Sequence, residues 1–341
     1  MSNKITIQRV AELANVSKAT VSRVLNGYPH VRPAVREKVQ RVIDETGYQP
    51  NNIARLLASD RSSIIGLAIS SSAQMVFSDP YFPAITEAVS KSAASNDLVL
   101  SLFVSYSEQQ GRDTLASIMA AGLLDGLILT ADYKGISVLP YLRQADIPFL
   151  FIGRPANTDG IHYVDADNVQ GGYLATSHLI ELGYQRVATI GSNRNAAGDD
   201  RVTGYRKALK EGGLAWDERL VAFGDYSPES GYAGMQALIP FMPDAVFVAS
   251  DTMALGALRA LREAGLRVPA DIALVSHDDL PPAVQADPPL TTVRQPISRT
   301  GQVAVEKLEQ IIGNGKSKPV ENTVLPVKLI VRGSCGALPV N

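Results

Sequence analysis

The sequence predicts a small all-α helix-turn-helix head, a hinge helix, and a two-lobed α/β domain of parallel sheets with helices on both faces. Three observations predict this arrangement. Short capped amphipathic helices fill about the first fifty residues, apolar strand-like runs alternate with helical stretches over about 280 further residues, and the first 62 residues carry an excess of positive charge.

The second helix of the head is expected over residues 17–27. Ser17 can accept a backbone N–H as an N-cap, and Gly27 can adopt the left-handed conformation that ends a helix. Helical spacing divides the residues between into an apolar face and a polar one. The apolar face is expected to hold Val21, Val24 and Leu25, and the polar face Lys18, Ala19, Thr20, Ser22 and Arg23.

Helices on either side complete a three-helix unit. Thr6 can cap a first helix, and only a tight turn separates that helix from Ser17. Two short helices joined in this way form a helix-turn-helix, whose second helix has the dimensions of the DNA major groove. A third helix is expected to begin at Pro33 and to end at Gly47.

Charge divides the chain into two parts. Residues 1–62 hold ten Lys and Arg against five Asp and Glu, a net charge of +5, whereas the remaining 279 residues carry −7. A basic head on an acidic body is typical of a domain that binds phosphate backbones. The alternative is a small helical bundle of another purpose.

A hinge helix is expected over residues 51–58. Pro50 disfavours helix at the residue before it, and Asn51 can cap a new helix. Two turns are too few to be stable alone in water, so the segment should fold only when a partner holds it. The predicted domains are therefore 1–49 for the helix-turn-helix, 50–62 for the hinge helix and linker, and 63–341 for the large domain.

The large domain is predicted to alternate strands and helices. Apolar runs typical of buried parallel strands lie at 63–70, 98–104, 126–130, 148–152, 186–190, 245–249 and 272–275. Helical stretches lie between them at 83–95, 107–121, 168–182, 202–212, 227–241 and 252–264. Because this length is large for one sheet, we expect two lobes, about 63–162 plus 292–324 and about 163–291 plus 325–341. A ligand cleft is expected between them, at the carboxyl ends of the strands.

Polar and aromatic side chains follow the predicted strands. Asp accepts hydrogen bonds from neighbouring hydroxyls, Arg donates two in parallel, and an aromatic face covers the C–H side of a sugar ring. This combination favours a small sugar as the effector. The expected contact residues are Ser70, Asp79, Tyr81, Phe82, Arg154, Asp165, Arg201, Asp251 and Asp278. An Asp at a strand end often only caps the next helix, and this alternative stays open for Asp165, Asp251 and Asp278.

Motifs of catalysis and of cofactor binding are missing from the sequence. There is no GxGxxG after a strand, no Walker loop, no GxSxG and no HExxH, so neither an enzyme nor a cofactor is predicted. His277, Asp278 and Asp279 lack a second cluster that would complete a metal shell, and a single cysteine, Cys335, allows no disulfide. Without an apolar signal region or a stretch of about 18 apolar residues, we expect a cytoplasmic protein with no membrane partner.

Two long strings of the head carry a specific resemblance. Residues 10–27, VAELANVSKATVSRVLNG, and 31–58, VRPAVREKVQRVIDETGYQPNNIARLLA, resemble the LacI/GalR family of bacterial transcription regulators. The likeness continues to Arg332. Two departures stand out: Arg32 replaces the usual Ser or Thr before the third helix, and Ser276-His277 replaces the usual Gly-Phe or Gly-Tyr before the paired aspartates.

The resemblance implies how the head meets operator DNA. It places Lys18, Ala19 and Arg23 at the base edges of the major groove, where Arg can bind guanine and Ala can contact the thymine methyl. The residues implied to contact phosphate are Thr6, Ser17, Thr20, Ser22 and Asn26. In the hinge helix, Leu57 is implied to wedge a minor-groove base step open, beside Asn51, Ala54 and Arg55. Packing of Leu56 and Leu57 on the next domain is the alternative.

The resemblance also implies a periplasmic-binding-protein-like effector domain and a homodimer on a near-palindromic operator. Its ligand contacts fall at Arg201 and Asp278, and often around Tyr81, Phe82, Asp165 and Asp251. The function implied is a repressor of sugar-utilisation genes whose operator affinity a mono- or disaccharide changes. The FIGRP segment with Arg154 is similar to relatives that respond to α-glucosides such as maltose. Alternatives are a corepressed regulator like the purine repressor, a global regulator driven by a protein partner, and a sugar receptor without DNA binding.

Overall fold

The structure is a computed structural model that describes residues 5–25, 28–48, 62–105, 117, 122–131, 142, 144, 147–193, 195–314 and 321–337. The chain divides into two compact units, residues 1–62 and 63–341. The first unit contains three helices: α1 (Ile7–Leu13), α2 (Lys18–Leu25) and α3 (Pro33–Thr46).

The helix ends of the head follow the expected capping residues. Thr6 Oγ1 accepts from the backbone N–H of Arg9 at 3.3 Å, and Ser17 Oγ accepts from that of Thr20 at 3.1 Å. Gly47 ends α3 with φ +61°, while Arg32 makes no side-chain cap. The three expected helices of the head are thus confirmed, whereas Gly27 and the hinge helix expected over 51–58 lie outside the described residues. The shared core of the three helices is formed by Val10, Ala11, Ala14, Val21, Val24, Val39 and Tyr48.

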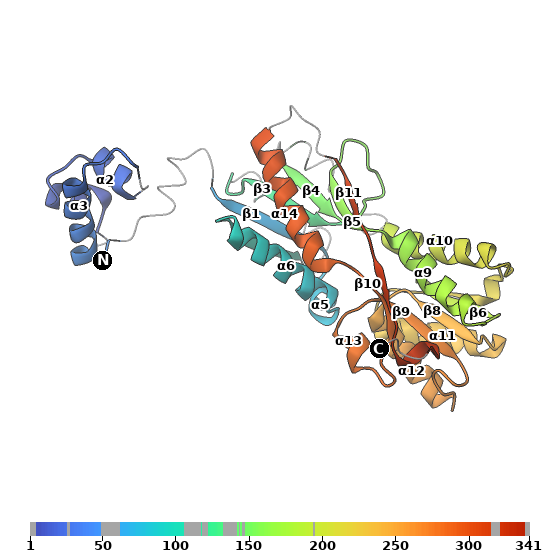
Figure 1. Ribbon diagram of the computed structural model, residues 1–341. Coiled ribbons are helices and arrows are strands. Elements are labelled where there is room, and N and C mark those ends of the chain that lie inside the picture. The colour runs from blue at the N-terminus through green and yellow to red at the C-terminus, as the bar shows by residue number, and fades with distance from the viewer. Residues whose placement is uncertain are drawn as a thin grey trace. The chain divides into compact units, whose positions relative to one another are not determined.

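The first lobe of the large domain holds a six-stranded sheet in the order β11-β5-β4-β3-β1-β2, with all its strands parallel. Helices α6 and α14 pack together against one face of it, as Figure 1 shows. The strands are β1 (Ile64–Ser72), β2 (Val99–Ser105), β3 (Gly126–Thr130), β4 (Phe149–Ile152), β5 (Tyr163–Ala166) and β11 (Thr323–Leu325), and the helices are α5 (Ala73–Ser78), α6 (Tyr81–Ser95) and α14 (Ile297–Asn314). The helix expected over 107–121 lies outside the described residues, apart from position 117.

The second lobe repeats this design with the order β12-β10-β9-β8-β6-β7, in which only β12 is antiparallel to its neighbour. Helices α9 and α10 cover one face, and α11 and α12 cover the other. The strands are β6 (Val187–Ser192), β7 (Val221–Gly224), β8 (Ala245–Val248), β9 (Ala273–Asp278), β10 (Thr291–Arg294) and β12 (Lys328–Ile330). The helices are α9 (Asn168–Glu181), α10 (Ala196–Glu211), α11 (Pro228–Leu238), α12 (Asp251–Glu263) and α13 (Pro281–Gln285), with 3-10 turns η1 (Glu218–Leu220), η2 (Ile239–Phe241) and η4 (Gly333–Cys335).

The chain crosses between the sheets three times, slightly later than the sequence suggested. Strand β5 still belongs to the first sheet, and all of β10 belongs to the second, where Thr292 pairs with Ser276. The expected lobe limits at 162, 291 and 324 therefore move to the ends of β5, β10 and β11. The difference arises because β5 and β10 carry polar residues and lack the apolar run used to recognise the other strands. Among the described helices, none combines the length and the apolar character that crossing a membrane would require.

Candidate functional site

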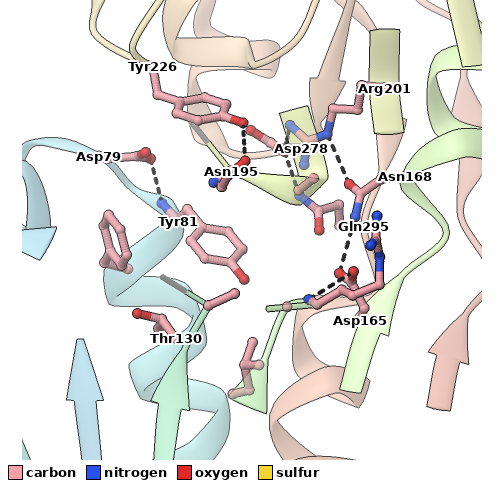
Figure 2. Close-up of a pocket in the computed structure, with 16 residues that line it drawn as sticks. Asp79, Tyr81, Thr130, Asp165, Asn168, Asn195, Arg201, Tyr226, Asp278 and Gln295 are labelled. Carbon is pink, nitrogen blue, oxygen red and sulfur yellow. Dashed lines mark hydrogen bonds and ion pairs between the residues drawn. The ribbon is translucent and has the colours of Figure 1, made fainter. Parts of the chain in front are cut away.

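A pocket lies between the two sheets, at the carboxyl ends of their strands, where open α/β sheets bind ligands (Figure 2). Its empty space is about 790 Å³, which includes space open to solvent. Both lobes contribute to it. The lining residues are Asp79, Tyr81, Phe82, Thr130, Ala131, Ile152, Gly153, Arg154, Asp165, Asn168, Asn195, Ala197, Arg201, Tyr226, Asp278 and Gln295.

Asp165, at the end of β5, is held by three donors. Its Oδ1 accepts from the backbone N–H of Ala166 at 2.8 Å and from Asn168 Nδ2 at 3.1 Å, and its Oδ2 accepts from the backbone N–H of Arg154 at 3.1 Å. Burial nevertheless raises the pKa of this carboxyl to about 6, because it disfavours the charged form. Asp165 is thus a fixed acceptor on the pocket wall.

Arg201 is the sixth residue of α10, which begins before the expected stretch 202–212 because Asn195 caps it. Its Nε donates to Asn168 Oδ1 at 3.0 Å, and its Nη1 donates to the carbonyl oxygen of Ala249 at 2.5 Å. A Cβ on Gly172 would lie 2.0 Å from the Arg201 carbonyl oxygen, so this glycine permits the close approach of α9 and α10. The guanidinium is therefore oriented by both neighbours.

Asp278 is the last residue of β9 and has φ +116°, a conformation that L-residues rarely adopt. Its Oδ1 accepts from Gln295 Nε2 at 2.6 Å and lies 3.5 Å from Arg201 Nη1. The side chain is only 8% exposed. Figure 2 shows Asp278 beside Arg201 and Gln295, across the pocket from Tyr81.

The opposite wall is formed by the start of α6. Asp79 Oδ1 accepts from the backbone N–H of Tyr81 at 3.0 Å, and burial raises the pKa of the Asp79 carboxyl to about 6. The rings of Tyr81 and Phe82 meet edge to face, with centroids 5.6 Å apart. Burial also raises the pKa of the Tyr81 hydroxyl, so this hydroxyl stays protonated and can donate.

Sequence reasoning missed five polar residues of the pocket, which are Thr130, Asn168, Asn195, Tyr226 and Gln295. Tyr226 donates its hydroxyl to Asn195 Oδ1 at 3.0 Å, and Asn168 and Gln295 hold Arg201 and Asp278 as described. The signal available for Gln295 was its place directly after a strand of the second sheet. Tyr226 has φ +73°, a conformation no propensity indicates.

One expected contact residue does not line the pocket. Asp251 is fully buried and is not among the residues that line the pocket. Its carboxylate accepts from the Ser276 hydroxyl at 2.5 Å, the Thr292 hydroxyl at 2.7 Å and the backbone N–H of Leu280 at 2.8 Å. It therefore joins β9, β10 and α12. The alternative that Asp251 caps α12 is wrong, because Ser250 is the N-cap of this helix. Ser70 lies in β1, and its side chain is outside the described part of the structure.

The head presents most of its expected DNA-binding residues to solvent. Lys18, Ala19 and Arg23 on α2 are exposed, as are Thr6 and Ser17, whereas Thr20 and Ser22 are half-buried. The Ser17 and Thr20 hydroxyls lie 2.9 Å apart. The expected contacts Asn26, Asn51, Ala54, Arg55 and Leu57 lie outside the described residues.

The pocket offers hydrogen-bond acceptors, two guanidinium groups and aromatic faces, which bind and orient a polar molecule. Among the described residues, no group of three His, Cys, Asp or Glu could hold a metal ion. A helix-turn-helix head together with a polar pocket between two lobes defines the class of ligand-responsive DNA-binding regulators.

Comparison with known proteins identifies the family. Residues 6–51 match the profile of bacterial regulatory proteins of the lacI family, and residues 176–335 match a periplasmic binding protein-like domain. The HTH-type transcriptional regulator CelR of Thermobifida fusca is 39% identical over 334 residues, which cover 96% of this chain and 98% of CelR. The HTH-type transcriptional repressor PurR of Klebsiella pneumoniae is 35% identical over 96% of each chain. This chain therefore belongs to the lacI family and is a transcriptional regulator, as are these relatives, which are not enzymes.

Solved structures agree with this assignment. A CelR–cellobiose complex matches 97% of this chain and 99% of its own, with 38% identity and a TM-score of 0.77. A lac repressor dimer bound to operator and the anti-inducer ONPF matches 98% of this chain and 100% of its own, with 30% identity and a TM-score of 0.87. The predicted family and fold class are confirmed.

Proposed function

We propose that this protein is a repressor of sugar-utilisation genes whose operator affinity changes when a small sugar binds between its two lobes. The observation that carries the proposal is the pocket itself. Asp79, Asp165 and Asp278 surround one cavity with Arg201 and the aromatic pair of Tyr81 and Phe82. Carboxylates that accept from hydroxyls, beside rings that cover C–H groups, suit a saccharide better than an apolar ligand.

A glucose disaccharide is the first candidate within that class. The relative CelR is described as a complex with cellobiose, and it is similar to this chain over nearly the whole length. Maltose contains the same two glucose units joined by an α linkage. Comparing maltose with cellobiose therefore tests which linkage the pocket prefers.

DNA binding is assigned to the exposed face of α2 and to the hinge residues named above. The lac repressor relative is described as a dimer bound to operator. We extend this arrangement to the present chain, so that two heads meet a near-palindromic operator and residues 63–341 form the effector-binding and dimerisation domain. Ligand and DNA are then linked: a sugar that weakens operator binding must itself bind less tightly to the operator complex, by the same factor.

Corepression is the second candidate. The relative PurR is a repressor whose similarity also extends over 96% of this chain. In that case a purine base would occupy the pocket and strengthen DNA binding. The aromatic pair of Tyr81 and Phe82 could stack on a base, but three carboxylates around it favour a ligand rich in hydroxyl donors.

The experiment combines a ligand screen with DNA binding. The thermal stability of the full chain is measured with cellobiose, maltose, glucose, hypoxanthine and guanine, since a ligand that binds only the folded state raises the melting temperature. Each hit is then added to an operator-binding assay. A saccharide hit that changes operator affinity supports the proposal, a purine hit supports corepression, and no hit from either group contradicts both.

A pair of variants tests the site. Asp278→Asn removes a pocket carboxylate, whereas Asp217→Asn breaks an exposed ion pair with Arg219 in the same lobe. Only the first variant should lose the thermal shift with sugar. Equal losses in both variants would argue against this pocket as the binding site.

A further inference from the structure

His277 is a buried residue that the proposed function does not yet use. It occupies β9 directly before Asp278, and its side chain is fully buried. The sequence also marks it as a departure from the aromatic residue that relatives carry before the paired aspartates. A polar ring in this place requires a partner, because burying an unpaired polar group is costly.

The two ring nitrogens of His277 have different surroundings. Nδ1 lies 3.0 Å from Asp278 Oδ1, whereas Nε2 has no hydrogen-bond partner among the described residues. On that side the ring meets α9 at Gly171, where an added Cβ would lie 2.5 Å from Nε2. A carboxylate oxygen facing Nδ1 requires the proton to be on Nδ1, which leaves Nε2 as a bare lone pair.

The charge state agrees with this tautomer. Burial, together with the nearby guanidinium of Arg201, lowers the pKa of His277 to about 4, against a smaller opposing effect of Asp278. A charged ring would also need an acceptor at Nε2, and Gly171 provides none. The ring is therefore a neutral donor at physiological pH.

The Nδ1–H of His277 is one of the groups that surround Asp278 Oδ1. Asp278 Oδ1 accepts from His277 and from Gln295 at 2.6 Å, and it faces Arg201 at 3.5 Å. Among the described residues, no donor is bound to Oδ2. The three groups on Oδ1 hold the side chain in place and leave Oδ2 for a ligand.

We propose that His277 is a positioning residue which, as a neutral Nδ1–H imidazole packed on Gly171, orients Asp278 so that Oδ2 receives a hydroxyl of the bound sugar. This inference rests on the proposed function for its ligand, but not for the state of the ring. The requirement for space explains why a glycine occupies position 171, the fourth residue of α9, where it costs stability relative to alanine.

The ring is tested first without any ligand. The chain has four histidines, so nitrogen-15 NMR of the histidine-labelled protein resolves few signals, and His277→Phe identifies the one that disappears. We expect that signal to report a neutral Nδ1–H tautomer that does not titrate between about pH 5 and 8. An Nε2–H tautomer, or titration near pH 6.5, would overturn the inference.

The effect on binding is tested with cellobiose by calorimetry. His277→Phe keeps the ring volume and removes the donor, whereas His277→Asn restores an N–H near the position of Nδ1. We expect about tenfold or weaker binding for the Phe variant and affinity within about threefold of wild type for the Asn variant, with melting temperatures checked for both. Unchanged affinity in the Phe variant, or equal loss in two well-folded variants, would overturn the inference.

The NMR and the calorimetry together distinguish a failure of this inference from a failure of the proposed function. If wild type binds no saccharide, the proposed function is wrong, and the NMR result alone decides the state of His277. If wild type binds cellobiose but the ring carries its proton on Nε2, the sugar site stands and the role of His277 is wrong.

Discussion

Arg154 donates from Nη2 to both carboxylate oxygens of Asp200, at 2.7 Å each. Arg154 follows β4 in the first lobe, and Asp200 lies in α10 on the second. The ion pair therefore joins the two lobes beside the pocket that Arg154 lines. A contact of this kind favours the arrangement of the lobes in which it forms, and a ligand that binds this arrangement gains from it.

Asp200→Asn should weaken cellobiose binding by about 2- to 5-fold, because it removes a partly exposed ion pair while keeping the side-chain shape. Calorimetry at about 0.05 M and about 1 M salt checks the cause. Wild type should lose affinity as salt rises, whereas the variant should change less, since screening acts on the missing pair. Asp217→Asn, whose ion pair with Arg219 lies within one lobe, is the control and should behave as wild type.

Asp79→Asn should stabilise the ligand-free protein at pH 7.5 and keep only about half of this advantage at pH 5. Burial raises the pKa of Asp79 from 3.8 to about 6, so between these values the folded state holds a proton that the unfolded state has lost. Stability therefore falls as pH rises through this window, by on the order of 2–3 kcal/mol. The Asn variant keeps the Oδ1 acceptor for Tyr81 and removes the charge.

Chemical denaturation of both proteins at the two pH values measures this difference. Asp271→Asn is the control, and it should change the free energy of unfolding in the opposite direction. Hydrogen bonds from Arg267 lower the pKa of Asp271 to about 2, so its charge stabilises the folded state. That variant should be destabilised equally at pH 5 and pH 7.5. A constant difference between Asp79→Asn and wild type at both pH values would show that Asp79 is not a strained buried charge.

Local features of the fold could be predicted from the sequence. The caps at Thr6, Ser17 and Gly47 depend only on neighbours in the chain, and all three are present. The strand-end residues Asp165 and Asp278 were also predictable, because carboxyl ends of parallel strands meet at one edge of a sheet.

Features set by strand pairing could not be predicted in this way. In the sequence, Asp251 follows a strand just as Asp165 and Asp278 do. Its carboxylate nevertheless accepts hydrogen bonds from the hydroxyls of Ser276 and Thr292, which lie far along the chain. Only the pairing of β9 with β10 brings those hydroxyls together. Tyr226 reaches the pocket through a backbone conformation that its residue type disfavours.

Arg23→Ala should weaken binding to the specific operator by about 10- to 100-fold and relax the preference for one base pair, because Arg can form two hydrogen bonds to guanine. Arg23 is exposed on α2, so its loss should leave the head folded. Lys38→Ala removes an equal charge from the exposed surface of α3 and serves as the control. Operator-binding assays at fixed salt compare the two, and equal losses would mean that Arg23 contributes charge alone.

Asp279→Asn should destabilise the large domain by about 3 kcal/mol, since it leaves a buried ion pair without its anion. Asp279 is only 4% exposed and accepts from Arg294 Nε at 2.5 Å and from Arg332 Nη2 at 2.6 Å. These bonds join the residue after β9 to the end of β10 and to the segment after β12. Denaturation measures the loss, with the exposed Asp271→Asn as the matched control, and a loss no larger than in that control would contradict the role.

Gly171→Ala should reduce sugar affinity through His277 alone. The new Cβ would meet the imidazole at 2.5 Å from Nε2 and 3.0 Å from Cδ2, so the ring must move away from its place beside Asp278. In a His277→Ala background the same Cβ finds open space, and Gly171→Ala should cost little further affinity. A double-mutant cycle with cellobiose measures this coupling. Two independent, additive losses would mean that Gly171 acts on the helix and not on the ring, whereas a strongly non-additive cycle follows directly from the contact between them.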